Sequence, residues 1–256
     1  MTDVLLVRSE GVGERDAAAM AAKGIAVELD AYLEVRPLGS AVNDAAGLLD
    51  AISDDADWLI VASKSGVDAL VALLGEEAVT RALAQGLDRG LRVAAVGRTT
   101  ASRLQDLGAV EVLVGEPQTA AGLLEVLWGQ QPGTAVYPLG DLASPLLRES
   151  LESLGWASRS AVVYSTQPVS ERPRTAAALA AGAYRVVVLR SPSAVAAVSR
   201  WVPHWPSRTT FLCGGETTAA AARAAGIGKL VVSDGPDSKS VAAAVSRLLG
   251  SDPEER

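Results

Sequence analysis

Histidine and cysteine are almost absent from this chain of 256 residues, which has one of each, His204 and Cys213. A single cysteine excludes an intrachain disulfide and any metal site built from several cysteines. A single histidine excludes the zinc motifs that need two. His204 stands between Pro203 and Trp205, a stiff setting that favours a surface histidine over a Ser-His-Asp triad. We therefore expect neither a metal site nor a hydrolase-type nucleophile.

Excess basic charge and long apolar runs are also lacking. The chain has 23 Lys and Arg against 30 Asp and Glu, a net charge of −7. This balance argues against a nucleic-acid partner and against an anionic membrane surface. The longest uncharged stretch, residues 126–140, is too short and too rich in Gly, Gln and Pro to span a bilayer. No signal peptide is predicted before the apolar run that starts at Val4, so a cytoplasmic location is the default expectation.

Short apolar runs are abundant, and they predict an α/β fold. They are mostly aliphatic and do not alternate with polar residues, which is typical of parallel strands buried on both faces. Ala- and Leu-rich stretches of helical length separate them, which indicates βα units. The predicted strands are 4–7, 58–62, 92–96, 110–114, 134–137, 184–189, 209–213 and 229–232. The predicted helices include 98–107, 118–128, 141–154, 192–201, 215–225 and 238–249.

A repeat divides the chain into two copies of one unit. Residues 57–67 (DWLIVASKSGV) and 185–195 (RVVVLRSPSAV) each read as a strand, a Ser-x-Ser turn and a helix. A Gly-x-Thr-Thr-Ala sequence follows later in each half, at 97–101 and 215–219. The first half carries about ten extra residues between the two motifs, which fits an insertion around 75–90. Two α/β domains are therefore expected.

Four strand-to-helix turns supply the candidate binding residues. Such turns offer hydroxyls and unpaired amides at the positive end of a helix, and they lie at the carboxyl ends of parallel strands, where α/β sheets bind ligands. They suit an anionic ligand, although plain helix capping explains any single turn equally well. The candidates are Ser63, Lys64, Ser65, Gly97, Arg98, Thr99 and Thr100 in one half, and Ser191, Ser193, Gly215, Thr217 and Thr218 in the other.

Two arginines and one tyrosine complete the candidate site. Arg8 follows the predicted strand 4–7, and Arg190 follows the predicted strand 184–189. An arginine in this place is suited to bind a carboxylate with two hydrogen bonds, and the alternative is a solvated charge at the end of a strand. Residues 28–38 and 158–168 are strand-like and suit two segments that cross side by side between the domains. Tyr164 ends an apolar run in the second segment. Its phenol is a candidate proton donor, and packing at a hinge is the alternative.

Together these motifs resemble the uroporphyrinogen-III synthase family over nearly the whole chain. The resemblance implies two flavodoxin-like parallel-sheet domains, joined by a two-stranded linker, with the active site in the cleft between them. It implies a discontinuous domain of residues 1–36 and 168–256 and an inserted domain of residues 37–167. The sequence departs from the family pattern at Ser9, where a proline is usual, and at Cys213-Gly214, where an aliphatic residue is more usual.

The resemblance also implies a reaction. Its substrate is hydroxymethylbilane, a linear tetrapyrrole with eight carboxylates, which loses its hydroxyl as water and closes with the last pyrrole ring inverted. It implies no cofactor, a catalytic role for Tyr164, and a monomer in transient contact with the preceding enzyme of the pathway. Two other readings stay open, a non-catalytic cytoplasmic regulator that binds a small anion and a transferase that uses a nucleotide or a sugar.

Overall fold

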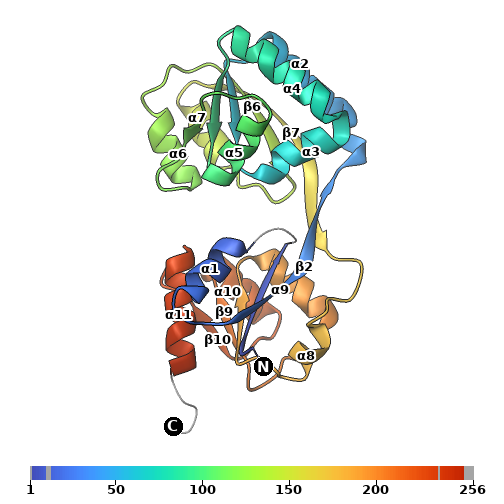
Figure 1. The fold of residues 1–256 in the computed structure, drawn as a ribbon, viewed down its shortest axis with the longest axis vertical. Coiled ribbons are helices and arrows are strands. Elements are labelled where there is room, and N and C mark those ends of the chain that lie inside the picture. The colour runs from blue at the N-terminus through green and yellow to red at the C-terminus, as the bar shows by residue number, and fades with distance from the viewer. Residues whose placement is uncertain (1, 10–12, 236, 251–256) are drawn as a thin grey trace. The chain divides into compact units, whose positions relative to one another are not determined.

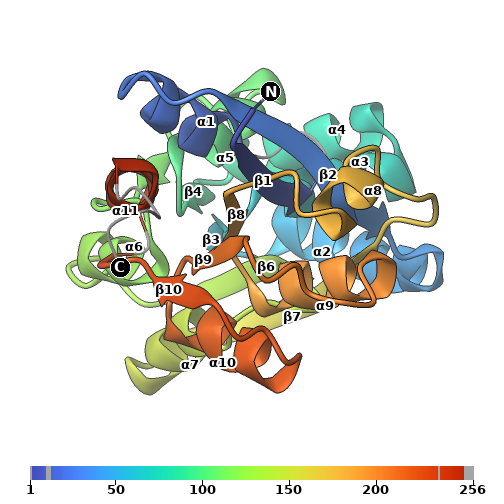
Figure 2. The same ribbon diagram turned by 90° about the horizontal axis from the view of Figure 1, so that it is seen from below.

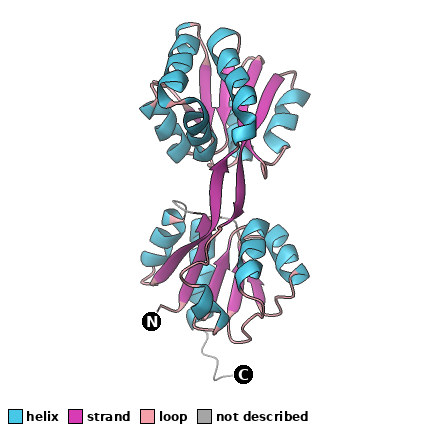
Figure 3. Ribbon diagram, turned by 90° about the vertical axis from the view of Figure 1, so that its right-hand side faces the viewer, coloured by secondary structure: helices cyan, strands magenta, loops and turns pink. Residues whose placement is uncertain are grey.

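A computed structural model describes residues 2–9, 13–235 and 237–250. The chain divides into two compact units, and unit 1 comprises residues 1–35 and 167–256 while unit 2 comprises residues 36–166. Each unit is a mixed α/β fold in which a central sheet lies between helices (Figure 3). Every strand pair with a described register is parallel, as the unbroken apolar runs predict.

The described part of unit 1 contains five strands in the order β10-β9-β8-β1-β2. Helices α9 and α10 cover one face, and α1 and α11 lie side by side on the other (Figure 2). The strands are β1 (Val4–Ser9), β2 (Val27–Pro37), β8 (Val186–Leu189), β9 (Thr210–Cys213) and β10 (Leu230–Val232). The helices are α1 (Glu14–Ala21), α8 (Ala176–Ala180), α9 (Pro192–Trp201), α10 (Glu216–Ala224) and α11 (Ser238–Gly250).

Unit 2 contains five strands in the order β7-β6-β3-β4-β5. Helices α2 to α7 surround this sheet (Figure 1). The strands are β3 (Trp58–Val61), β4 (Arg92–Ala95), β5 (Leu113–Val114), β6 (Thr134–Gly140) and β7 (Ala157–Pro168). The helices are α2 (Val42–Asp54), α3 (Lys64–Leu74), α4 (Glu76–Asp88), α5 (Arg98–Asp106), α6 (Ala120–Leu127) and α7 (Leu146–Ser153), with a 3-10 turn η1 (Gly39–Ala41) before α2. The insertion expected around 75–90 is helix α4.

The chain passes from one unit to the other twice, in β2 and in β7. Within unit 1 the Val169 amide donates to the Tyr32 carbonyl (3.0 Å), and within unit 2 the Leu38 amide donates to the Val163 carbonyl (2.9 Å). The neighbours β1 and β6 each have a register shift at the last residue, so that Ser9 faces Leu33 and Gly140 faces Tyr164. The same irregularity in both units is a structural counterpart of the sequence repeat.

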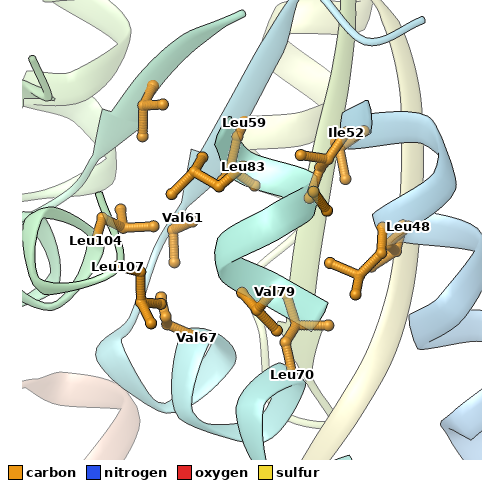
Figure 4. Packing of buried hydrophobic residues seen from close by; sticks show 14 of the residues in the cluster. Leu48, Ile52, Leu59, Val61, Val67, Leu70, Val79, Leu83, Leu104 and Leu107 are labelled. Carbon is orange, nitrogen blue, oxygen red and sulfur yellow. The ribbon is translucent and has the colours of Figure 1, made fainter. Parts of the chain in front are cut away.

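Each sheet has an apolar core on both faces. In unit 2 one core joins β3 and β4 to α2, α3, α4 and α5, and its leucine, isoleucine and valine side chains interdigitate around Leu59 and Val61 (Figure 4). The other face carries α6 and α7 and buries Trp58 against Trp156, with ring centroids 5.3 Å apart. This two-sided burial is what strands such as WLIV, without polar alternation, require.

Two predicted elements are shorter than expected. The strand expected at 110–114 is only Leu113–Val114, because Val110 projects into solvent, where 85% of its surface is exposed at the edge of the sheet. The helix expected at 141–154 starts at Leu146. Pro145 precedes it at the cap position, where a residue without an N–H is well tolerated, and residues 141–144 instead form the turn after β6.

Arg89 gives a first test of how the insertion is anchored. Its guanidinium donates to the carbonyls of Ser53 (2.7 Å), Ile52 (3.2 Å) and Ala56 (3.4 Å) around the end of α2. Because these carbonyls have no helical partner, Arg89→Ala is expected to lower the free energy of unfolding by about 1–2 kcal/mol in urea titrations. Arg81→Ala is the control, since Arg81 only pairs with Glu77 on the exposed face of α4, and should cost less than about 0.5 kcal/mol.

Candidate functional site

The predicted site residues gather at the carboxyl edge of the sheet in each unit. Because the strands are parallel, the turns that follow β3, β4 and β6 share one edge of unit 2. The turns that follow β8 and β9 likewise share one edge of unit 1, where β1 also ends. In α/β folds this edge is where ligands bind, since helix N-termini and loops converge there. The predicted candidates thus form two groups, one in each unit.

The Ser-x-Ser turns cap helices in both units. The Ser63 Oγ accepts a hydrogen bond from the Ser65 amide (3.2 Å) at the start of α3. The Ser191 Oγ accepts one from the Ala194 amide (3.2 Å) at the start of α9 and lies 2.8 Å from the Ser193 Oγ. Capping is therefore one role of both serines. It uses an acceptor lone pair and leaves each hydroxyl hydrogen for another partner.

The Gly-x-Thr-Thr turns have a glycine as the cap residue. Gly97 and Gly215 occupy the cap positions of α5 and α10 and have no side chain with which to accept a hydrogen bond. In both helices the first threonine, Thr99 or Thr217, is exposed, and the second is buried. Thr100 has 5% and Thr218 has 2% of its surface exposed. The first threonine of each pair therefore faces solvent at the carboxyl edge, and the second packs inside.

Tyr164 lies beside Ser63 in unit 2. The two residues come from different elements, β7 and the turn after β3, and the Ser63 hydroxyl is close enough to affect the ionisation of the phenol. Burial raises the pKa of Tyr164, the Ser63 side chain lowers it, and the nearby Asp141 carboxylate raises it, with a raised pKa as the net result. The Asp141 amide donates to the Tyr164 carbonyl (3.0 Å), and the Asp141 Oδ1 accepts from the Thr166 amide (2.9 Å). These bonds attach the end of β7 to the turn after β6.

Arg8 and Arg190 share a buried aspartate in unit 1. The Asp16 carboxylate lies 3.3 Å from the Arg190 Nε and accepts from the Ser238 hydroxyl (2.6 Å). Asp16 is only 3% exposed. Burial lowers the pKa of Arg8, Asp16 raises it, and the Arg190 charge lowers it, so the three charged groups lie close enough to interact. The Glu14 carboxylate also raises the pKa of Arg8, so the two guanidiniums lie among two carboxylates, of which Asp16 is the buried one.

Lys64 and Arg98 are both exposed. The Lys64 Nζ pairs with the Asp68 carboxylate (2.5 Å) one turn along α3, so this cation already has a carboxylate partner. The Arg98 backbone amide donates to the Gln118 Oε1 (3.1 Å). This bond occupies the first amide of α5, so the amides of this turn are not all open to a ligand.

Sequence reasoning missed three residues of this arrangement. Gly140 and Asp141 follow a strand in the way of an ordinary turn, and only the register of β6 with β7 places them against Tyr164. Asp16 reads as a routine acidic residue in the first turn of a helix. The sequence does hold one signal for the burial of Asp16. It precedes the apolar Met20 by four residues, so both side chains lie on the same face of α1, which is the buried one.

Three further observations concern the residues that the structure describes. Among them, no group of three or more His, Cys, Asp or Glu is arranged to hold a metal ion. The one histidine, His204, is exposed in a loop, as predicted. Within the described ranges no helix has the length and apolar character needed to cross a bilayer.

Comparison with known proteins identifies the family. The family model described as uroporphyrinogen-III synthase HemD matches residues 14–243, about nine-tenths of the chain. The chain belongs to the uroporphyrinogen-III synthase family. It is therefore an enzyme of tetrapyrrole biosynthesis, and its reaction is the closure of hydroxymethylbilane to uroporphyrinogen III. No curated protein sequence matches it.

Solved structures of similar proteins agree on the fold. The chain is similar to uroporphyrinogen-III synthetase from Helicobacter pylori, with 17% identity and a TM-score of 0.60 over 97% of this chain and 100% of that one. It is also similar to a mutant uroporphyrinogen III synthase from the extremely thermophilic bacterium Thermus thermophilus, with 20% identity and a TM-score of 0.54 over 96% of this chain and 98% of that one. At such identities the likeness shows the α/β fold of a uroporphyrinogen-III synthase and not the roles of individual residues.

Proposed function

We propose that this enzyme closes hydroxymethylbilane mainly by positioning it, with the Tyr164 phenol assisting departure of the hydroxyl. The observation that carries the proposal is the place of the Tyr164 ring, which lies against Gly140 at the carboxyl edge of unit 2, in a chain that the family model matches from 14 to 243. The phenol donates its proton as the carbon–oxygen bond breaks, and the bonding electrons leave with the oxygen as water. The pyrrole nitrogen lone pair stabilises the cation that remains.

The closing steps need little further chemistry from the protein. The cation is attacked by the substituted carbon of the last pyrrole ring, which forms a spiro intermediate, and that ring is then inverted as the macrocycle closes. A ring carbon finally loses a proton, which balances the one that Tyr164 gave. No strong nucleophile is required, so the absence of a triad in this sequence agrees with the proposal. Holding one conformer of a flexible substrate is catalysis by proximity and orientation.

The substrate carboxylates are proposed to bind at both carboxyl edges. Arg8 and Arg190 are the proposed carboxylate partners in unit 1, together with the turns at Ser191, Ser193, Gly215 and Thr217. In unit 2 the proposed partners are the turns at Ser63, Ser65, Gly97 and Thr99. A carboxylate at a helix N-terminus gains about 0.3–1 kcal/mol, and up to ~2 kcal/mol when partly buried. Several such contacts plus two guanidiniums approach the ~8 kcal/mol of micromolar binding, so an acidic protein can bind this polyanion.

The two units are proposed to be two flavodoxin-like domains. Counted along the chain within unit 1, the strand order is 2-1-3-4-5, the order of flavodoxin-like sheets. Unit 2 gives the same order when β6 is counted as its first strand, which makes it a circular permutation of unit 1. This correspondence supports domain boundaries near residues 36 and 167. A monomeric state, a cytoplasmic location and a transient contact with the preceding enzyme stay predictions.

The isomers of the product test the proposed function. The protein is incubated with hydroxymethylbilane made enzymatically, and the isomers of the product are separated. Uroporphyrinogen III in excess of the type-I isomer formed spontaneously is the expected result. Type-I isomer alone, from a folded protein, would contradict the proposal and would favour a binding protein or a transferase.

The threonine pairs give a test of binding against packing. Thr99→Ala and Thr217→Ala are each expected to weaken substrate binding about 2–10-fold, the loss of one hydrogen bond, and to change stability by less than about 0.5 kcal/mol. Thr100→Ala and Thr218→Ala remove buried atoms and are expected to cost about 1–2 kcal/mol of stability. Steady-state KM values and urea titrations measure the two effects. A fall in stability with unchanged KM for Thr99→Ala or Thr217→Ala would indicate capping alone.

A further inference from the structure

The Tyr164 ring reaches over the end of β6. Tyr164 belongs to β7, Ser63 follows β3, and β6 lies between these two strands in the sheet. Gly140, the last residue of β6, faces Tyr164 in the register, and the atoms of the phenol lie next to its Cα. The side chain that the reaction is proposed to use therefore passes directly over a glycine, on the side from which Ser63 lowers its pKa.

Gly140 leaves the space that the ring occupies. A Cβ atom added at Gly140 would lie 2.4 Å from the Tyr164 Cζ, 2.5 Å from its Cε2 and 2.7 Å from its hydroxyl oxygen. Contacts this short cannot exist, so any larger residue would displace the phenolic end of the ring. The φ angle of Gly140 is not among the positive ones, so alanine can adopt its backbone conformation. The glycine is needed here for space and not for backbone freedom.

The Ser63 hydroxyl lies near the phenol and lowers its pKa. The Ser63 Oγ accepts a hydrogen bond from the Ser65 amide at the start of α3. Because that bond uses a lone pair, the Ser63 hydrogen is left for donation to the Tyr164 oxygen, and the phenol's own proton is left for the substrate. A donor at the phenol oxygen favours the phenolate, in agreement with the direction in which Ser63 moves the Tyr164 pKa.

Unit 1 has no tyrosine with a facing glycine at the matching positions. After the same register shift, Ser9 stands where unit 2 has Gly140, and Leu33 stands where unit 2 has Tyr164. The serine after the third strand is retained as Ser191, and it caps α9. The fold of the unit therefore does not need a phenol or a glycine here. Their combination in unit 2 points to the reaction and not to packing.

We propose that Gly140 and Ser63 are positioning residues that fix the Tyr164 phenol for proton donation, an inference that rests on the proposed function. Gly140 sets where the ring lies, and the Ser63 hydroxyl sets which way the phenol proton points. Each acts through Tyr164, and their loss should lower kcat more than it raises KM.

Gly140→Ala tests whether the Tyr164 ring needs the space above residue 140. We expect kcat for uroporphyrinogen III to fall roughly 10–100-fold, the cost of a misplaced catalytic group, with more type-I isomer among the products. The urea midpoint should change little, because the atoms displaced are the far end of a flexible side chain. Gly47→Ala in α2 is the matched control, since a Cβ there meets nothing within 4 Å, and it should turn over like the wild type.

Ser63→Ala and Ser63→Thr test the hydrogen bond. Ser63→Ala should lower kcat about tenfold or more, and Ser63→Thr, which keeps a hydroxyl and still caps a helix, should restore most of it. The phenol itself gives a readout independent of turnover, the ultraviolet titration of each protein minus that of its Tyr164→Phe counterpart. The Tyr164 pKa should move upward in Ser63→Ala and return in Ser63→Thr.

The outcomes separate the two proposals. If Tyr164→Phe is slow while Gly140→Ala and Ser63→Ala both keep wild-type kcat and isomer ratio, positioning is wrong and the proposed role of Tyr164 stands. If Tyr164→Phe keeps the wild-type rate, the role of Tyr164 is wrong and the positioning role falls with it. A shifted phenol titration in Ser63→Ala would then show that the hydrogen bond exists without a part in catalysis.

Discussion

Tyr164→Phe is expected to slow the formation of uroporphyrinogen III by about 10²-fold, the lower end of the range for a lost general acid. The lower end applies because the pyrrole nitrogen already drives water out, so the phenol assists a step that proceeds without it. KM should change little, since the ring remains in place over Gly140. Product isomers from enzymatically made hydroxymethylbilane give the measurement, and spontaneous closure should raise the share of the type-I isomer.

Tyr137→Phe is the matched control for this substitution. Tyr137 lies in β6 of the same unit, is 2% exposed, and its hydroxyl has no hydrogen-bond partner among the described residues. Burial raises its pKa strongly, as expected of a phenol that stays protonated in a core. Removing this hydroxyl should leave kcat and the isomer ratio as in the wild type. Equal rates for Tyr164→Phe and the wild type would mean that Tyr164 only packs against the core that joins β3 and β4 to α2, α3, α4 and α5.

Much of the fold could be predicted because the signals are local. Apolar runs without alternation specify strands buried on both faces, and β3 with its four buried residues WLIV matches its run. The sequence predicts the helix starts at Ser63 and Ser191, since a serine before an apolar stretch is a favoured cap, and each of the two accepts the expected hydrogen bond. Element ends were harder, because an exposed edge such as Val110 carries no packing signal.

The site was less predictable because its contacts are not local. Tyr164 and Ser63 lie far apart in the sequence, and only the order β7-β6-β3 brings them together. The sequence could place Arg8 and Arg190 after equivalent strands, but it could not show that Asp16 is buried with them, since an acidic residue in a first helical turn is usually solvated. A repeat predicts which positions are equivalent and says little about the residues in which the two copies differ.

Asp16 should therefore matter more to stability than its position in the sequence suggests. It is 4% exposed as a side chain, its partner Arg190 is 15% exposed, and the charge of Arg8 is close by. Removing one partner of a buried pair leaves the other charge without compensation in a medium of low dielectric constant. Asp16→Asn is expected to lower the free energy of unfolding by about 3 kcal/mol, the lower end for such a loss, because the amide oxygen still accepts from Ser238.

A second aspartate supplies the control for Asp16→Asn. Asp55 also pairs with an arginine, Arg159, at 2.6 Å, but both side chains are about half exposed. Water screens this pair, so Asp55→Asn should cost less than about 1 kcal/mol in the same urea titrations. Equal losses for the two variants would mean that Asp16 does not compensate Arg8 and Arg190. A large loss for Asp16→Asn alone, with a raised KM for hydroxymethylbilane, would show that one buried carboxylate both stabilises unit 1 and orients the guanidiniums proposed to bind the substrate.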